Sequence, residues 1–518
     1  MVLVAPPVAR PCEPPAGIAK LQGALNSHGA KCEILDLNAE SLLGLLRDCR
    51  TPTDTWTHRA SRNLSLHLAS LRSWRAYGHF ARYRRAVVDL NRILEMAAIS
   101  RGIRVGLANY QHPQLSPLKS VDLLRAAERP EENPFYPYFS KRIQQVLDGD
   151  PPSVLGFSLN YLSQALCTFA MIGFLKRHCP GIKLVLGGGL ATSWMKRPSW
   201  QNPFQGLVDF LVAGPGEYPL LSMMDFQTGT GEIHSLPDYD SLPLEDYFAP
   251  GRILPYSSSS GCYWNRCSFC PEKAEGNPYT PIPVDRVILD LNTLIKKMKP
   301  VLVHLLDNAI PPALMEKIAD HPLGVPWYGF ARISRHLTDL DFCLTLKKSG
   351  CVLLQLGLES GDQGVLDEMQ KGIDLGMASR ALEVLKQAGI ATYVYLLFGT
   401  PMETRSAARK TLEFAVRHHD QIHFLNLAIF NLPVYGAEAQ KVQTKKFYEG
   451  DLTLYTNFSH PKGWNRNLVR QFLDREFKRH PAIGPILRRD PPIFTSNHAP
   501  FFVMDEPLAD WERSALQG

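Results

Sequence analysis

Three cysteines lie within nine residues in the stretch GCYWNRCSFC, at positions 262, 267 and 270. Thiolates this close together are typical ligands of a zinc ion or of an iron–sulfur cluster. Structural zinc needs four ligands, but no further Cys or His occurs between Cys270 and His304. Three thiolates instead suit a four-iron, four-sulfur cluster with one iron open to another ligand. The spacing favours the cluster, and leaves zinc or incidental thiols as alternatives.

The sequence around the cysteines predicts a scaffold that would present this loop. The apolar segment RILPY ends just before it, and five more apolar segments follow with helical stretches between them. They are VLVHLLD, WYGFARI, CVLLQLGLES, ATYVYLLFGTP and IHFLNLAIF. Alternating strands and helices predict a parallel (β/α) barrel, partial or full, over residues 252–437. The cysteine loop would then lie at the C-terminal mouth, where barrels carry their chemistry.

A second α/β unit is predicted in front of the barrel. The chain opens with the strand Val2–Ala5, the helical segment GIAKLQGALNSHG and the strand KCEILDL. The rhythm resumes at SVLGFSLN and continues through KLVLGGG and VDFLVAGPGE. This pattern predicts a doubly wound parallel sheet over residues 1–233, with a helical insertion at about 42–148. Residues 234–251, Pro-rich and acidic, predict a linker, and residues 438–518 a small, mostly helical region.

The composition excludes several classes of protein. The 518 residues are 45% hydrophobic and 20% charged, and a net charge of +6 is too small for a general nucleic-acid or membrane binder. No apolar run reaches the roughly 18–20 residues that span a bilayer, and no basic region of a signal peptide opens the chain. Ten cysteines, mostly scattered singly, are too few for a disulfide scaffold and predict a reducing, cytoplasmic location.

One basic segment, Arg72–Arg85, interleaves four aromatic residues with its charges. Such a pattern can bind nucleic acid, so a zinc-stabilised RNA-binding module is an alternative function of another class. An amphipathic helix packed on the sheet explains the segment more simply. Nucleic acid is therefore not an expected partner.

The region from about Ile253 to Gly436 resembles the radical S-adenosylmethionine (SAM) superfamily. The resemblance rests on the cysteine loop together with GFARI, LGLESGDQGVLDEMQKG and LLFGTPMET, which follow in the expected order. The spacing C-x4-C-x2-C is one residue longer than the commonest spacing of the superfamily, C-x3-C-x2-C. This departure weakens the assignment to a subfamily more than it weakens the prediction of a cluster. The resemblance implies that Cys262, Cys267 and Cys270 hold one 4Fe-4S cluster, whose open iron binds the amine and carboxylate of SAM.

The resemblance also implies SAM-binding residues at successive strand ends. They are Phe269 and Gly399 against the adenine, Asp307 at the amino group or ribose, Arg332 at the carboxylate and Glu359 at the ribose hydroxyls or amine. Structural roles are the alternatives: core packing for Phe269, a helix cap for Asp307 and an ion pair for Arg332. Lys371 fits a solvated helix end as well as a ligand.

The N-terminal sheet resembles the cobalamin-binding domain that precedes many radical SAM enzymes. In such a sheet a large ligand lies across the carboxyl ends of the strands. The implied binding residues are Ser158, Gly187, Gly188, Gly189, Thr192, Gly214 and Gly216. The motif D-x-H-x-x-G, whose histidine ligates cobalt, is absent. The alternative is that the N-terminal sheet binds no cofactor.

Together the two resemblances imply a cobalamin-dependent radical SAM enzyme, most often a C-methyltransferase acting on an unactivated carbon. One SAM would methylate reduced cobalamin. A second would be cleaved to a 5′-deoxyadenosyl radical that abstracts hydrogen, and the substrate radical would take the methyl group of methylcobalamin. A cyclisation, ring contraction or other rearrangement without methyl transfer is the alternative. An electron donor such as flavodoxin or ferredoxin is implied, whereas small-molecule, lipid and peptide substrates all stay open, and no catalytic residue is identified.

Overall fold

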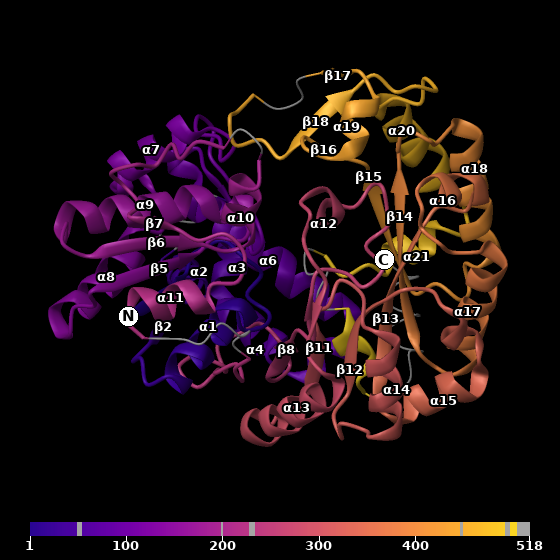
Figure 1. The fold of residues 1–518 in the computed structure, drawn as a ribbon, viewed down its shortest axis with the longest axis horizontal. Helices are drawn as coiled ribbons and strands as arrows, with labels where there is room; N and C mark the ends of the chain where they lie inside the picture. The colour runs from indigo at the N-terminus through magenta and orange to yellow at the C-terminus, as the bar shows by residue number, and fades with distance from the viewer. Residues whose placement is uncertain (49–53, 198–199, 227–233, 446–448, 493–497, 505–518) are drawn as a thin grey trace.

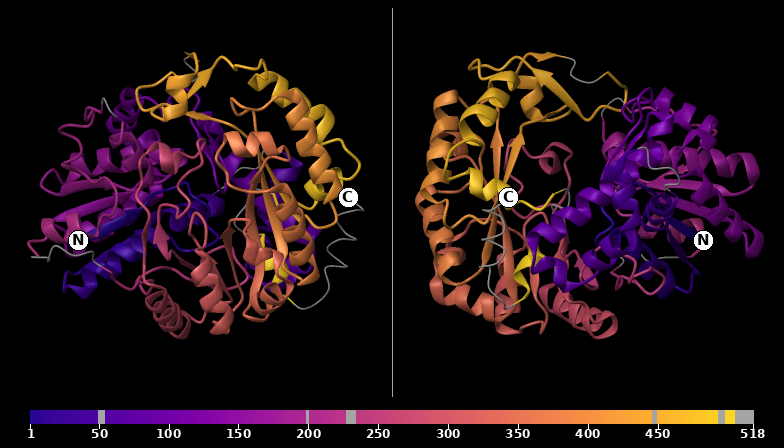
Figure 2. Two further views of the ribbon diagram at one scale, coloured as in Figure 1. Left: turned by 45° about the vertical axis from the view of Figure 1, so that its right-hand side comes forward. Right: turned by 180° about the vertical axis from the view of Figure 1, so that it is seen from behind.

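Two parallel sheets organise the chain, one in each half, and the two α/β units lie beside each other (Figures 1 and 2). The computed structural model describes residues 1–48, 54–197, 200–226, 234–445, 449–492 and 498–504. Within this described part, no helix has the length and apolar character needed to cross a membrane.

The N-terminal sheet has five parallel strands in the order β2-β1-β5-β6-β7. Their bounds are β1 Val2–Ala5, β2 Glu33–Asp36, β5 Val154–Ser158, β6 Lys183–Gly187 and β7 Phe210–Leu211. In β1, Leu3 packs into the core that contains α1 (Ala16–Ser27) and α11 (Glu217–Met223), while Val4 packs into the core of α9 (Leu162–His178). The sheet is therefore doubly wound, as predicted. From β1 the sheet extends to β2 on one side and, later in the chain, to β5 on the other, so the strand order reverses between β1 and β5. The carboxyl ends of these two strands therefore border a switch-point crevice.

A largely helical insertion separates β2 from β5. It comprises α2 Leu37–Arg47, α3 Thr55–Arg62, α4 Leu64–Leu71, α5 Trp74–Tyr77, α6 Phe80–Ala98, the hairpin β3 Arg104–Val105 and β4 Tyr110–Gln111, α7 Ser120–Glu128 and α8 Tyr136–Gly149. In the basic aromatic segment, Tyr77, Phe80 and Tyr83 are buried. These rings pack in the core as an amphipathic helix requires, so they are not available to stack on RNA bases.

The second sheet has six parallel strands in the order β15-β14-β13-β12-β11-β8. They are β8 Ile253–Tyr256, β11 Leu302–Leu305, β12 Trp327–Ala331, β13 Cys351–Glu359, β14 Ala391–Phe398 and β15 Phe424–Ile429. Between them run α13 Val284–Met298, α14 Pro312–Asp320, α15 Leu340–Lys348, α16 Gln363–Glu368, α17 Leu375–Gln387 and α18 Arg405–Arg417. Strands β8 and β15 are the two edges of the sheet and are not paired with each other. The predicted barrel is therefore a partial one.

The C-terminal region combines the expected helices with a small sheet. It contains α19 Ala437–Lys441, α20 Arg466–Phe472 and α21 Gly484–Arg488, and an antiparallel sheet of β16 Leu432–Pro433, β17 Thr444–Lys445 and β18 Tyr455–Phe458. Strands this short carry too few alternating residues to be read from the sequence. The region arches over the barrel mouth (Figure 2), and its last described helical turn, Ala499–Phe502, contacts β13.

Candidate active site

The cysteine loop leaves β8 and is tied down at its start by Asp307, which follows β11. This carboxylate is 1% exposed and accepts hydrogen bonds from the Ser258 backbone N–H at 3.1 Å and the Ser258 hydroxyl at 2.7 Å. The Ser259 hydroxyl donates to it at 2.5 Å. Burial raises the pKa of Asp307, and these hydrogen bonds oppose that shift. Both carboxylate oxygens thus hold the loop, rather than standing open toward the expected SAM site.

The three cysteines lie half-buried along this loop. Burial raises the pKa of the Cys267 and Cys270 thiols above the usual value. Within the ranges described, no three His, Cys, Asp or Glu side chains converge as ligands of one metal ion. A cluster does not require such convergence, because its three thiolates bind three different irons. Three half-buried thiols on one anchored loop therefore fit a 4Fe-4S cluster with one open iron.

A buried ion pair lies beside the cysteine loop. The Nζ of Lys371 is 2.8 Å from Glu359 Oε1, and the two side chains are 8% and 13% exposed. The same ammonium is 5.5 Å from the ring centroid of Phe269. Arg332 donates to the Lys371 carbonyl at 2.6 Å and stacks 4.1 Å from the Trp264 ring. Phe269, Arg332 and Glu359 are thus gathered around the loop, and Lys371 is a buried partner rather than a solvated helix end.

The backbone at the end of β13 is shaped for this pair. Glu359 has a φ of 68°, in the left-handed region, and the register to β14 shifts between Gly357 and Glu359. A Cβ at position 357 would lie 2.7 Å from Glu359 Oε1 and 2.8 Å from Lys371 Nζ. Glycine at 357 therefore leaves room for the ends of these two side chains over the strand.

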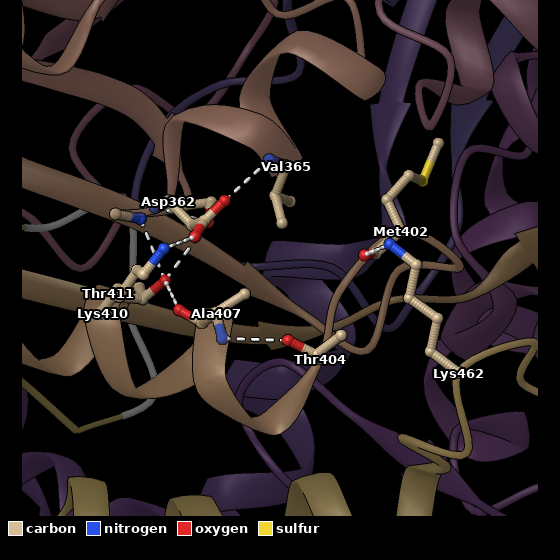
Figure 3. A network of polar contacts seen from close by, with 10 residues as sticks. Asp362, Val365, Met402, Thr404, Ala407, Lys410, Thr411 and Lys462 are labelled. Atoms are coloured by element: carbon tan, nitrogen blue, oxygen red, sulfur yellow. Dashed lines mark hydrogen bonds and ion pairs between the residues drawn. The ribbon is translucent and has the colours of Figure 1, made fainter.

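Polar contacts fix the turns that follow β13 and β14 (Figure 3). Asp362 caps α16 by accepting from the Val365 N–H at 3.0 Å, and it pairs with Lys410 at 2.7 Å. Thr404 caps α18, and Lys462 donates to the Met402 carbonyl at 2.5 Å. Both turns are thereby held rigidly next to Glu359 and Gly399.

The second turn begins at Gly399, whose φ of 82° favours glycine. Its N–H donates to the buried Glu403 carboxyl at 2.5 Å, and the Trp464 indole N–H donates to the same oxygen at 2.8 Å. The other oxygen, Oε1, is buried with no hydrogen-bond partner in the described part of the chain. Burial raises the pKa of Glu403 from 4.5 to about 7.

A pH dependence of stability follows from Glu403. Because its pKa is higher in the folded than in the unfolded chain, the folded state binds the proton more tightly. This stabilisation is full below pH 4.5 and is lost as the pH rises through about 7. We expect the wild type to lose up to about 3 kcal/mol relative to Glu403→Gln between pH 5 and pH 8. Urea unfolding midpoints at the two pH values measure this, and parallel pH profiles would contradict it.

A cavity of about 690 Å³ lies where the two α/β units meet. All seven residues predicted to bind cobalamin line it: Ser158, Gly187, Gly188, Gly189, Thr192, Gly214 and Gly216. The opposite wall comes from the cysteine loop and β18 and includes Ser260, Gly261, Pro271, Glu272, Glu275 and Tyr455. One cavity thus borders both the strand ends of the N-terminal sheet and the loop that carries the thiols.

Some of the predicted residues shape the wall of this cavity. The Thr192 hydroxyl donates to the Gly188 carbonyl at 2.9 Å and accepts from the Gly214 N–H at 3.0 Å, so it ties two strand-end turns together. Gly188 has a φ of 99°, and a Cβ there would lie 2.5 Å from the Leu159 carbonyl oxygen. By contrast, a Cβ at Gly187 or Gly189 would meet no atom closer than 3.5 Å. At Gly187 and Gly189 the wall of the cavity is therefore flat and free of side chains.

Glu275 was not predicted from the sequence. Its Oε1 accepts hydrogen bonds from the Ser193 hydroxyl at 2.7 Å and from the Tyr435 hydroxyl at 2.9 Å. These contacts join α10 (Gly189–Met195) of the N-terminal unit, the cysteine loop and the C-terminal region. No local pattern signals this role, because the three partners are far apart in sequence.

Comparisons with known proteins agree with this geometry. Residues 256–415 match the radical SAM superfamily. The chain is 28% identical over 264 residues to an uncharacterized methyltransferase of Pyrococcus horikoshii, covering 46% of this chain and 54% of the relative. It is 26% identical over 190 residues to the anaerobic magnesium-protoporphyrin IX monomethyl ester cyclase of Rubrivivax gelatinosus, covering 35% and 34%. The chain thus spans about half, or less, of the length of the curated relatives it matches.

Solved structures share the arrangement of both units. The radical SAM methyltransferase TsrM of Kitasatospora setae, with tryptophan and a SAM analogue bound, aligns with a TM-score of 0.58 at 13% identity over 100% of this chain and 95% of that one. The cobalamin-dependent enzyme OxsB, with aqua-cobalamin bound, aligns with a TM-score of 0.52 at 14% identity over 82% and 52%. Identities this low show the fold alone. The chain therefore carries a radical SAM domain over residues 256–415 and shares the fold of these solved structures.

Proposed function

We propose that this enzyme is a cobalamin-dependent methyltransferase that methylates an unactivated carbon of its substrate. The observation that carries the proposal is the 690 Å³ cavity between the strand ends of the N-terminal sheet and the cysteine loop. A corrin placed across strand ends there would lie next to the cluster and SAM, which is the juxtaposition that methyl transfer to a substrate radical needs.

The residues present fit the proposed cofactors. Gly187 and Gly189 give the cavity a wall without side chains, as a large flat ring requires. Cys262, Cys267 and Cys270 would hold the cluster, and Glu359 with Arg332 would face the charged groups of SAM. When bound, the reduced cluster would supply the electron that cleaves SAM, and cobalamin would carry the methyl group.

The proposed reaction balances with two SAM molecules and two electrons. The substrate R–H gives its hydrogen atom to the 5′-deoxyadenosyl radical, and the carbon receives a methyl group. The products are R–CH3, S-adenosylhomocysteine, 5′-deoxyadenosine and methionine. The electrons would come from a low-potential donor such as flavodoxin or ferredoxin. Cys262, Cys267 and Cys270 form no disulfide with one another, which supports a reducing, cytoplasmic setting.

Cofactor analysis tests the proposal. The protein is purified without oxygen, its cluster is reconstituted, hydroxocobalamin is added, and iron and cobalt are measured with a visible spectrum. We expect about four irons and about one cobalt per chain. A protein that binds iron but no cobalt would refute methyl transfer through cobalamin. A protein that binds zinc but no iron would refute the radical chemistry as well.

A variant of Gly189 separates the two cofactors. A Cβ fits at position 189, and a leucine side chain there would extend into the cavity. Gly189→Leu is therefore expected to exclude cobalamin while the iron content stays unchanged. Gly181→Leu is the matched control, because Gly181 precedes the amino end of the same strand β6 and has open space around it. Cobalt analysis after gel filtration measures the effect. If Gly189→Leu kept the cobalt content of the wild type, cobalamin would bind outside this cavity.

A rearrangement without methyl transfer is the second candidate, favoured by the likeness to a curated cyclase. It would use the same cofactor sites but form no S-adenosylhomocysteine and add no carbon to the substrate. Product mass therefore distinguishes the two reactions.

A further inference from the structure

A second cleft adjoins the cavity of the proposed function. Its volume is about 680 Å³, and it lies on the seam between the N-terminal unit and the C-terminal region. Lys119 and Arg197 line it from the N-terminal unit, and Val434 and residues between 449 and 456 line it from the C-terminal region. Tyr455 lines both this cleft and the 690 Å³ cavity, so the two spaces meet at that side chain. We call the second space the seam cleft.

Backbone contacts hold the two walls of the seam cleft together. The Leu452 N–H donates to the Leu118 carbonyl at 3.0 Å, and the Ser120 N–H donates to Asp451 Oδ1 at 2.9 Å. A Cβ at Gly450 would lie 1.9 Å from the Leu118 carbonyl oxygen, so glycine permits this close approach of the two chains. The seam cleft is therefore built into the packing of the N-terminal unit against the C-terminal region.

Thr453 brings a hydroxyl without a partner to the seam cleft. The residue lines the cleft and is 7% exposed, and its Oγ1 is buried with no hydrogen-bond partner within the described ranges. A buried hydroxyl in this state has lost its hydrogen bonds to water and gained none in return, which is costly. A ligand that exchanges a hydrogen bond with Thr453 would remove that cost.

Four charged side chains line the seam cleft without pairing with one another. Among the residues that the structure describes, the Lys119 ammonium and the Glu449 carboxylate have no ion-pair or hydrogen-bond partner. Arg197 donates to the Asp451 backbone carbonyl, and the Asp451 carboxylate accepts from the Ser120 backbone N–H. The seam cleft thus offers two cations and two carboxylates, and their charges sum to zero.

A zwitterion matches this arrangement better than a ligand of one sign. A simple anion would pair with the two cations but would also face two carboxylates, and a simple cation would meet the opposite conflict. A molecule with an ammonium and a carboxylate forms charge-assisted hydrogen bonds with both sets. The volume of about 680 Å³ lies within the roughly 300–1,000 Å³ that is usual for small-molecule sites.

We propose that the seam cleft binds the ammonium and carboxylate groups of a zwitterionic substrate, an amino acid or a short peptide, whose remaining part extends past Tyr455 toward the cysteine loop. The carboxylate pairs with the two cations, the ammonium pairs with the two acidic side chains, and Thr453 exchanges a hydrogen bond with a polar group of the substrate. This inference rests on the proposed function and names its substrate class. It disfavours lipids, since a long apolar chain would face four charges in the seam cleft.

Fluorine NMR on the reconstituted protein tests the inference. The probes are 4-fluorophenylalanine, its N-acetyl derivative, which lacks the ammonium, and its primary amide, which lacks the carboxylate. We expect the zwitterion to bind about tenfold more tightly than either derivative, because each derivative loses one charge-assisted interaction. A tripeptide with 4-fluorophenylalanine between two glycines distinguishes the two sources, because a peptide site binds it more tightly than the free amino acid.

Two charge variants assign the preferences to their partners. Lys119→Gln should reduce the preference for the zwitterion over the amide to about threefold, since one of the two cations remains, and should leave the preference over the N-acetyl derivative unchanged. Glu449→Gln should have the reverse effect. Lys183→Gln is the matched control, because Lys183 is an exposed lysine at the amino end of β6, and it should keep both preferences.

Two results would overturn the inference: the zwitterion binds no more tightly than its derivatives, or both charge variants keep the preferences of the wild type. Thr453→Val gives an arm that does not depend on charge, because removing a partnerless hydroxyl should leave the thermal midpoint unchanged or higher and still weaken the zwitterion. Iron and cobalt are measured on the same samples. Missing cofactors refute the proposed function, whereas full cofactors without probe binding refute only the substrate class.

Discussion

Replacing Cys267 by alanine is expected to remove the iron–sulfur cluster and abolish SAM cleavage. Only Cys262 and Cys270 would remain on the loop, and no other Cys or His lies between Cys270 and His304 to take the vacant position. Two thiolates cannot hold three corners of a four-iron cluster. Iron per chain, the visible absorption of the cluster and the yield of 5′-deoxyadenosine measure the effect.

Cys32→Ser is the matched control for that experiment. Cys32 is also a half-buried free thiol, but it lies just before β2, away from the cysteine loop. It should keep full iron and full SAM cleavage. Iron retained in Cys267→Ala would show that the cluster has another ligand set, and equal iron loss in both variants would show a general folding defect.

Replacing Lys371 by methionine is expected to lower the free energy of unfolding of the apo-protein by about 3 kcal/mol, because it leaves the Glu359 carboxylate buried without its partner. Arg332 does not replace the lysine, since its hydrogen bond goes to the Lys371 backbone carbonyl. The double variant Glu359→Gln with Lys371→Met should recover part of the loss, since it buries no charge. Urea unfolding followed by tryptophan fluorescence measures the shift.

Lys410→Met provides the control for the buried pair. Lys410 pairs with Asp362 at a similar distance, 2.7 Å, but its side chain is 58% exposed. Solvent screens exposed pairs, so this substitution should change stability little. SAM binding offers a second readout, since only the Lys371 variant disturbs Glu359. Equal losses in the two variants would argue that burial of the Glu359–Lys371 pair has no special role.

The sequence by itself determined the features that depend on short segments. The three cysteines are local ligands on one loop, and the strands around them show as apolar runs between helical stretches, so the loop and the fold class could be predicted together. The glycines at the end of β6 could also be placed, because parallel strands bring their carboxyl ends to one edge. All seven predicted residues of that edge line one cavity.

Only the tertiary structure decided what depends on distant partners. Asp307 closes a strand, as the sequence predicts, yet its oxygens bind Ser258 and Ser259, which lie 49 and 48 residues earlier. Lys371 pairs with Glu359 because the turn after β13 folds back over the strand. The barrel is partial because β8 and β15 do not pair, and neither strand carries a local signal for that. Glu13 meets His304 of β11, 291 residues away, and no local pattern signals that contact. Local patterns specify which groups a segment offers, whereas packing between segments decides which of those groups are already paired and which are left for a ligand.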